Sequence, residues 1–242
     1  MFEESLLIHA SHVQREQLWA IRKYPCIGLG FFLTPYISRS PAYPAILERL
    51  EEGATLVDVG CFAGSDLRQL AFSGAPTANL YRIDIVNHWD FGYSIFRDES
   101  SFEAHFILAN ILSSDNPELL VLNGKVDIII VPALLHQWDW DKQVEVAKKV
   151  AAFTKPGSIV VGYQVGNATA KQFVNQAFQV PRWWHSPTSF RKMWDQVAVE
   201  TGSRWQTEAW LRSFQHLEWD VTDGAWLDPG GMIIDFVVTR VE

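Results

Sequence analysis

The sequence predicts an α/β fold built on a doubly wound, mostly parallel sheet, and three stretches of the chain indicate it. Residues 55–70 read TLVDVGCFAGSDLRQL: a β-branched apolar run, a glycine-containing turn and the start of a helical pattern. Residues 79–85, NLYRIDI, repeat a strand pattern after one helix length. Residues 125–135, KVDIIIVPALL, hold an almost unbroken apolar run, as expected of a central parallel strand covered on both faces.

Length and composition indicate one large globular domain. The 242 residues are enough for a full α/β core and too few for two ordinary domains with linkers. The formal net charge is −8 and lysine and arginine do not cluster, which argues against a nucleic-acid partner. The two cysteines, Cys26 and Cys61, have neither the spacing of a metal site nor the number of a disulfide framework.

The start of the chain has no signal-peptide pattern, and no run of 18 apolar residues is present. We therefore expect a cytoplasmic protein with no membrane span and no metal, and the sequence leaves a monomer and a homodimer open.

Residues 1–52 are expected to form a helical cap or lid. Apolar spacing predicts a helix over 3–23 and a short one over 44–51, and the glycine, proline and aromatic content of 26–44 predicts an irregular segment. Four aromatic side chains of this cap either face a ligand or pack within it: Tyr24, Phe32, Tyr36 and Tyr43.

The turn at residues 58–66 predicts a ligand-binding site. Gly60 and Gly64 allow positive φ and close approach of a ligand to the backbone, and Ser65 and Asp66 are candidate caps of the following helix. Asp58, two residues before Gly60, can accept hydrogen bonds from a ligand ammonium. Dinucleotide-binding turns space their glycines differently and usually lack this acid. Plain packing of a strand against a helix is the alternative interpretation.

Asp84 ends the second predicted strand, 26 residues after Asp58. In a strand–helix–strand unit this spacing brings a carboxylate next to the first turn, where it can accept from both hydroxyls of a ribose. A surface aspartate that closes a strand is the alternative.

The remaining elements follow from the same periodicities. They are, in chain order, a crossover at 90–103, a strand at 106–109, a helix at 141–153, a strand at 158–163, a helical segment at 173–178, an aromatic loop at 180–189, a helix at 190–202 and two late strands at 204–211 and 231–241. Within the single domain, residues 53–165 are expected to bind a cofactor and residues 166–242 to supply the substrate side.

The chain holds eleven tryptophans, which is many for its length. Seven of them lie in the last sixty residues, and a further two form another group earlier in the chain: Trp183, Trp184, Trp194, Trp205, Trp210, Trp219 and Trp226, and then Trp138 and Trp140. Clustered aromatic residues suit a pocket for a large, apolar, partly cyclic molecule. Ordinary core and surface packing explains them equally well.

Residues 58–64 resemble motif I of the class I S-adenosylmethionine-dependent methyltransferases, whose usual form is D-x-G-x-G-x-G. Asp58, Gly60 and Gly64 match the motif, whereas Phe62 stands at the position of its middle glycine. A K-P-G turn at 155–157, before a strand, is also frequent in that family. The resemblance implies a Rossmann-like fold of seven strands that ends in an antiparallel hairpin, with S-adenosylmethionine as cofactor.

The same resemblance assigns roles to single residues. Asn110 would bond the adenine amino group, and Ile111 would cover the face of the adenine ring. The cofactor-binding residues that the resemblance implies are Asp58, Gly60, Gly64, Asp84, Ile85, Asn110, Ile111 and Val131.

More narrowly, residues 57–70 and 80–85 resemble fungal methyltransferases of meroterpenoid biosynthesis, which methylate a carboxyl group of farnesylated polyketide acids. This implies O-methylation of a carboxylate on a bulky apolar small molecule in secondary metabolism. A carboxylate is ionised at neutral pH and needs no base, whereas a phenol benefits from one. His136, just beyond the predicted central strand, is the candidate catalytic residue, as a base or as a donor to the substrate. A loop histidine without a catalytic role is the alternative.

Three other functions fit the same pattern. Because Phe62 departs from the motif, the fold could have lost methyl transfer and act as a cyclase or isomerase. A non-catalytic ligand-binding protein on the same sheet is a second option, and a nicotinamide-dependent oxidoreductase is a weaker third.

Overall fold

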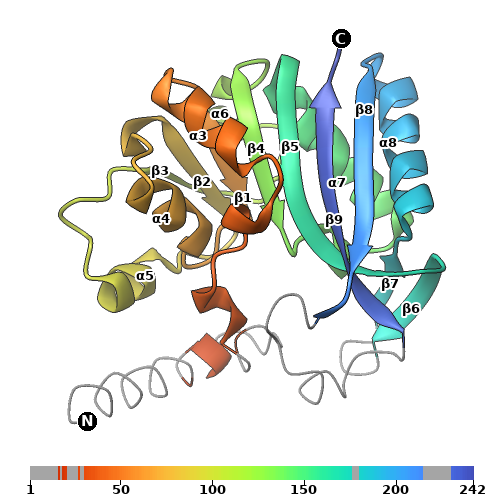
Figure 1. The fold of residues 1–242 in the computed structure, drawn as a ribbon, viewed down its shortest axis with the longest axis horizontal. Helices are drawn as coiled ribbons and strands as arrows, with labels where there is room; N and C mark the ends of the chain where they lie inside the picture. Colours follow the sequence, from red (N-terminus) through yellow and green to blue (C-terminus); the bar gives the residue numbers. More distant parts are fainter. Residues whose placement is uncertain (1–15, 17, 21–26, 28–29, 176–179, 215–229) are drawn as a thin grey trace.

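The computed structural model describes residues 16, 18–20, 27, 30–175, 180–214 and 230–242. Its main strands are β1 Leu56–Val59, β2 Leu80–Asp84, β3 His105–Leu108, β4 Val126–Pro132, β5 Thr154–Asn167, β8 Trp205–Arg212 and β9 Gly231–Arg240. They form one seven-stranded sheet in the order β3-β2-β1-β4-β5-β9-β8 (Figure 1). The first five strands are parallel, and β9 runs antiparallel between β5 and β8. The predicted fold class is confirmed, including its terminal hairpin.

Helices cover both faces of this sheet. They are α3 Tyr43–Glu51, α4 Ser65–Phe72, α5 Trp89–Phe96, α6 Pro117–Val121, α7 Trp140–Phe153 and α8 Pro187–Thr201. One core cluster joins α3, α4 and α5 to one face, and a second joins α6, α7 and α8 to the other. In β4, Ile128 and Ile130 point into the first cluster while Ile129 and Val131 point into the second. Burial on both faces explains why this strand reads as a continuous apolar run.

A second, two-stranded sheet corrects two sequence predictions. Residues 173–178 were expected to be helical and 180–189 to be a loop, but Lys171–Asn175 forms β6 and Val180–Trp184 forms antiparallel β7. Residues 176–179 lie outside the described part of the chain. The ring of Phe173 stacks on that of Trp184 with centroids 4.6 Å apart. Such aromatic cross-strand pairs stabilise a hairpin more than the local sequence pattern suggests.

The start of α4 also differs from its prediction. Neither Ser65 nor Asp66 caps the helix, whose N-cap is Gly64 in the left-handed conformation. The buried carboxylate of Asp66 instead accepts the backbone N–H groups of Tyr36 and Ile37, at 2.5 and 2.8 Å. These two hydrogen bonds hold the segment before α3 against the start of α4.

Most of the predicted helix at 3–23, together with Tyr24, lies outside the described residues. Within the part of the chain that the structure does describe, no helix is long and apolar enough to cross a membrane.

Candidate cofactor and substrate site

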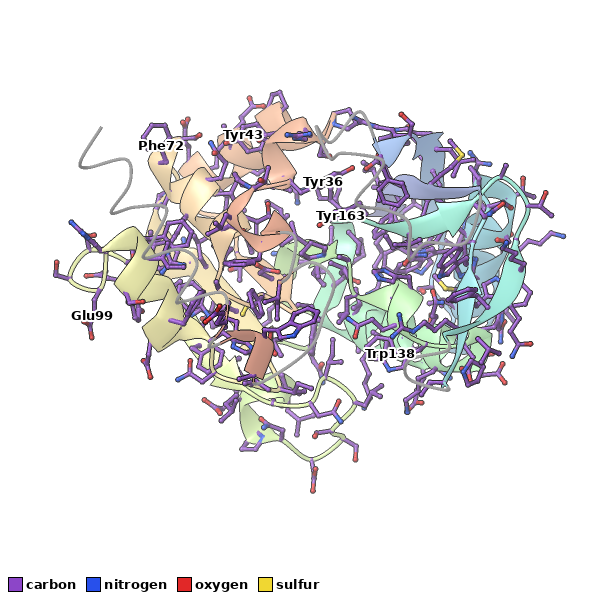
Figure 2. The ribbon with its side chains drawn as sticks, turned by 90° about the horizontal axis from the view of Figure 1, so that it is seen from below. Tyr36, Tyr43, Phe72, Glu99, Trp138 and Tyr163 are labelled. Atoms are coloured by element: carbon purple, nitrogen blue, oxygen red, sulfur yellow. The ribbon has the colours of Figure 1, made fainter. Side chains whose placement is uncertain are left out.

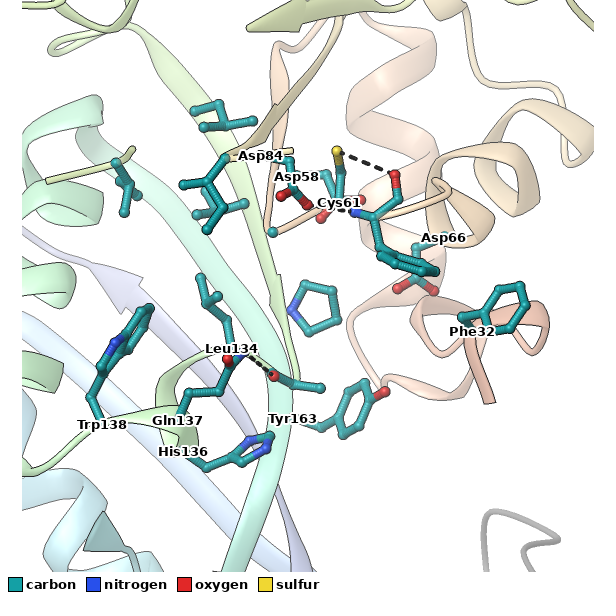
Figure 3. Close-up of a pocket in the computed structure, with 18 of the residues that line it drawn as sticks. Phe32, Asp58, Cys61, Asp66, Asp84, Leu134, His136, Gln137, Trp138 and Tyr163 are labelled. Carbon is teal, nitrogen blue, oxygen red and sulfur yellow. Dashed lines mark hydrogen bonds between the residues drawn. The ribbon is translucent and has the colours of Figure 1, made fainter. Parts of the chain in front are cut away.

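A cavity of about 520 Å³ lies beyond the carboxyl ends of β1, β2 and β4. Open α/β sheets bind their ligands at this edge. Figure 3 shows Asp58 and Asp84 on one side of the cavity and His136, Gln137 and Trp138 on the other. The same cavity is also lined by Phe173, Trp184 and Phe214, so one continuous space joins the acidic turn after β1 to residues of the predicted substrate side.

The acidic end of the cavity suits a cation. Asp58 is 1% exposed, and among the described residues its Oδ1 atom has no hydrogen-bond partner. Burial raises the pKa of Asp58 well above its ordinary value, and the nearby carboxylates of Asp66 and Asp84 raise it further. A ligand ammonium beside Asp58 would both satisfy the unpaired oxygen and offset this repulsion.

The carboxylate of Asp84 is held in a fixed orientation. Its Oδ2 accepts the backbone N–H of Phe62 at 2.9 Å, and its Oδ1 accepts that of Val86 at 3.1 Å. Each carboxylate oxygen has a second lone pair, and Asp84 lines the cavity. The predicted bonds to ribose hydroxyls are thus compatible with the bonds that Asp84 already makes.

The two motif glycines serve different purposes. Gly60, with φ of 77°, lines the cavity, and a Cβ there would lie 3.1 Å from the side chain of Leu134. Gly64, with φ of 74°, is not among the residues that line the cavity. A Cβ on Gly64 would come within 2.3 Å of the ring of Trp89. The missing side chain of Gly64 therefore makes room for Trp89.

Phe62, at the position of the middle glycine of the motif, has a backbone conformation that glycine adopts easily. Its φ is 45°, in the left-handed region that bulky residues rarely adopt. Its ring lies 4.4 Å from that of His88 and 5.4 Å from that of Phe32, and all three residues line the cavity. Phe62 therefore gives this side of the cavity an aromatic wall.

The left-handed conformation of Phe62 predicts that its glycine variant is more stable to unfolding than its alanine variant. Phe62→Gly should be about 1 kcal/mol more stable than Phe62→Ala, because only alanine retains the cost of a positive φ. Both variants lose the same ring contacts, so their difference isolates the backbone term. Urea unfolding of the two proteins measures it, and a more stable alanine variant would contradict the left-handed assignment.

The other residues implied by the resemblance divide between cavity and core. Ile85, Asn110 and Ile111 line the cavity, whereas Val131 is 1% exposed within the apolar core. The Oδ1 of Asn110 accepts the backbone N–H of Leu112 at 3.0 Å. One lone pair of that oxygen is left for an adenine amino group.

His136 lies in the 3₁₀ turn η4, Leu135–Gln137, and lines the far end of the cavity. The backbone N–H of Val165 donates to its Nδ1 at 3.4 Å, so the proton of the neutral ring belongs on Nε2. Burial lowers the pKa of His136 to about 3, and the charge of Arg182 acts in the same direction. At neutral pH His136 is therefore a neutral hydrogen-bond donor.

The aromatic residues also divide between cavity and core. Trp138 and Trp184 line the cavity with Phe173 and Phe214, while Trp194 is buried in the core. Trp219 and Trp226 lie outside the described residues.

The aromatic residues of the cap divide in the same way. Phe32 lines the cavity, but Tyr36 packs against Tyr163 with ring centroids 3.8 Å apart (Figure 2). The hydroxyl of Tyr43 is hydrogen-bonded to Ser73 at 2.7 Å and does not face the cavity.

Among the described residues no group of three or more histidine, cysteine or acidic side chains could hold a metal ion.

No protein-family model matches the chain, but curated relatives do. The O-methyltransferase phiE of a fungal species (strain ATCC 74256) is 36% identical over 196 residues, which cover 79% of this chain and 65% of the relative. The asnovolin E/chermesin D methyltransferase nvfJ of Aspergillus novofumigatus is 36% identical over 229 residues, which cover 93% of this chain and 80% of the relative. The chain belongs to this family of fungal methyltransferases. It spans just under two thirds of the length of phiE.

Solved structures share the fold of this methyltransferase family member. One is the 1,6-didemethyltoxoflavin-N1-methyltransferase of Burkholderia thailandensis, which was solved with S-adenosylhomocysteine. It matches with a TM-score of 0.61 at 12% sequence identity, and the match covers 100% of this chain and 90% of the methyltransferase. The cyclase SpnF matches with a TM-score of 0.56 at 12% identity and covers 82% of each chain. The first of these structures contains S-adenosylhomocysteine, the molecule that S-adenosylmethionine becomes when it gives up its methyl group. This ligand agrees with the expected cofactor, S-adenosylmethionine.

Proposed function

We propose that this protein is an S-adenosylmethionine-dependent O-methyltransferase that methylates a carboxylate on a bulky, apolar small molecule. One observation carries the proposal: a single cavity joins a carboxylate-rich end to an aromatic end that contains a neutral histidine. The names of the fungal relatives support methyl transfer, and nvfJ is named for asnovolin E and chermesin D. A role in fungal secondary metabolism, and in meroterpenoid biosynthesis more narrowly, is part of the proposal.

The acidic end of the cavity fits the cofactor. Asp58 would hold its ammonium, Asp84 its ribose hydroxyls, and Ile85 and Ile111 its adenine ring. When bound, S-adenosylmethionine supplies a methyl group that its sulfonium makes electrophilic. The chain then has to orient the acceptor and exclude water, which needs no strong base.

The state of His136 favours a carboxylate acceptor over a phenol. A carboxylic acid has a pKa near 4 and a phenol one near 10, so only the phenol must lose a proton at neutral pH. With its own pKa lowered to about 3 and its Nε2 protonated, His136 is poorly suited to take that proton. It is well suited to donate a hydrogen bond to a carboxylate oxygen.

The loss of methyl transfer, which Phe62 left open, has less support. Although it is not glycine, Phe62 takes up a left-handed conformation and its N–H donates to Asp84, so the turn stays joined to the carboxylate proposed to bind the ribose.

The pH dependence of methyl transfer tests the acceptor. Because His136 stays neutral above about pH 4, it adds no ionisation between pH 6 and 9. With a carboxylate acceptor the single-turnover rate should be flat over this range, and His136→Ala should lose about tenfold through positioning alone. A phenol acceptor predicts a rate that rises with pH and a loss of about 10²–10⁴ in the variant.

Calorimetric titration with S-adenosylmethionine is the first step of this test. Absence of binding at millimolar cofactor would contradict methyl transfer itself, whatever the acceptor.

A further inference from the structure

The aromatic end of the cavity contains one arginine, Arg182, whose half-buried side chain lines the wall together with Phe173 and Trp184. A guanidinium stays charged in proteins and presents its donors in a fork that matches a carboxylate. We propose that Arg182 binds the carboxylate of the substrate and selects acids over neutral molecules of the same shape. This inference rests on the function proposed above.

Backbone bonds fix the position of Arg182. It pairs with Phe173 across the β6–β7 hairpin, and the next residue, Trp183, donates its N–H to the carbonyl of Trp138 at 2.8 Å. The buried Nε2 of Gln143 bonds the carbonyls of Trp138 and Trp183 at 2.9 and 2.8 Å. These bonds hold the strand that carries Arg182 against the segment that follows η4, so the backbone at Arg182 is fixed before a ligand arrives.

His136 and Arg182 line the same cavity from adjoining segments, because the N–H of Trp183 donates to the carbonyl of Trp138. The charge of Arg182 is one of the two causes that lower the pKa of His136, and both side chains line the same cavity. The neutral ring offers an Nε2–H donor, because its Nδ1 accepts from Val165. A carboxylate at this end can accept from the guanidinium and the imidazole together, and hydrogen bonds to an ionised acceptor are the strong ones.

The distribution of charge in the cavity agrees with this role. Asp58 and Asp84 make one end acidic, which suits the cationic groups of the cofactor, and Arg182 contributes a guanidinium to the aromatic end. A methyl ester is neutral, so the product no longer attracts Arg182 and should leave more readily than the acid would.

Binding of apolar acids and their neutral amides tests the proposal. The probes are dehydroabietic acid and 4-phenylbenzoic acid, each with its primary amide, titrated calorimetrically into the full chain with S-adenosylhomocysteine present. The wild type should bind the acids at least tenfold more tightly than the amides. Arg182→Met should weaken acid binding by about 10- to 150-fold, the value of a charge-assisted hydrogen bond, and leave amide binding unchanged.

Two further variants sharpen the test. Lys171→Met removes a positive charge from the same hairpin outside the cavity and should bind like the wild type. Arg182→Lys keeps the charge without the fork and should fall between wild type and Arg182→Met. Equal binding of acids and amides, unchanged acid binding in Arg182→Met, or no acid binding at millimolar concentration would overturn the role of Arg182. Because S-adenosylhomocysteine binding is measured in the same samples, such a failure is distinguishable from failure of the cofactor site.

Discussion

Replacing Gly64 by alanine is expected to lower the free energy of unfolding by about 2–5 kcal/mol, the sum of two costs. The first is backbone strain of about 1–2 kcal/mol, because an L-residue would be held at a φ of 74°. The second is overpacking of about 1–3 kcal/mol, because the new Cβ would lie 2.3 Å from the ring of Trp89. Trp89 is 2% exposed and stacks on Phe102, so its ring has little room to move.

Gly74→Ala is the matched control. Gly74 also has a positive φ, of 99°, but a Cβ there would meet nothing within 4 Å. The control should therefore show the strain alone, and urea unfolding of both variants should give a difference of about 1–3 kcal/mol. If the two alanine variants are equally stable, the fit of Trp89 against Gly64 does not constrain the turn.

The sheet could be predicted from the sequence because its central strands, β1 and β4, are buried on both faces. In β4, the residues from Ile128 to Val131 alternate between the two core clusters, so this stretch is apolar without a break and the run is conspicuous. The β6–β7 hairpin could not be predicted in this way. The ring of Phe173 stacks on that of Trp184, and Gln143 bonds the carbonyl of Trp183, 40 residues along the chain, so neither contact appears in the local sequence pattern.

The cofactor end of the site could also be predicted from the sequence, because the carboxyl ends of parallel strands meet at one edge of the sheet. Asp58 and Asp84 could be placed together from their order alone, and both line the cavity. Asp66 was misassigned as a helix cap because its true partners, the N–H groups of Tyr36 and Ile37, come from a segment 29 and 30 residues away.

Arg182 was missed because a single arginine in an aromatic stretch resembles any surface cation. The one available signal was its position between Pro181 and the two tryptophans that follow it.

Asp84→Ala is expected to weaken the binding of S-adenosylhomocysteine by about 10- to 150-fold. A hydrogen bond from a ribose hydroxyl to a carboxylate is charge-assisted, and its loss costs about 1.5–3 kcal/mol. The same change removes the acceptor of the Phe62 and Val86 N–H groups, so the variant should also melt at a lower temperature. Asp90→Ala is the control, because Asp90 is exposed and outside the cavity.

Adenosine and 2′,3′-dideoxyadenosine separate the two roles of Asp84. If its carboxylate accepts from the ribose, Asp84→Ala should reduce the affinity for adenosine but leave that for the dideoxy compound nearly unchanged, since the hydroxyls are already missing. If Asp84 only supports the turn, both nucleosides should lose affinity equally. Calorimetric titration of the wild type and the variant with both compounds gives the four affinities that this comparison needs. An equal loss would reduce Asp84 to a residue that holds Phe62 in its left-handed turn, and the ribose would have to be bound by another group in the cavity.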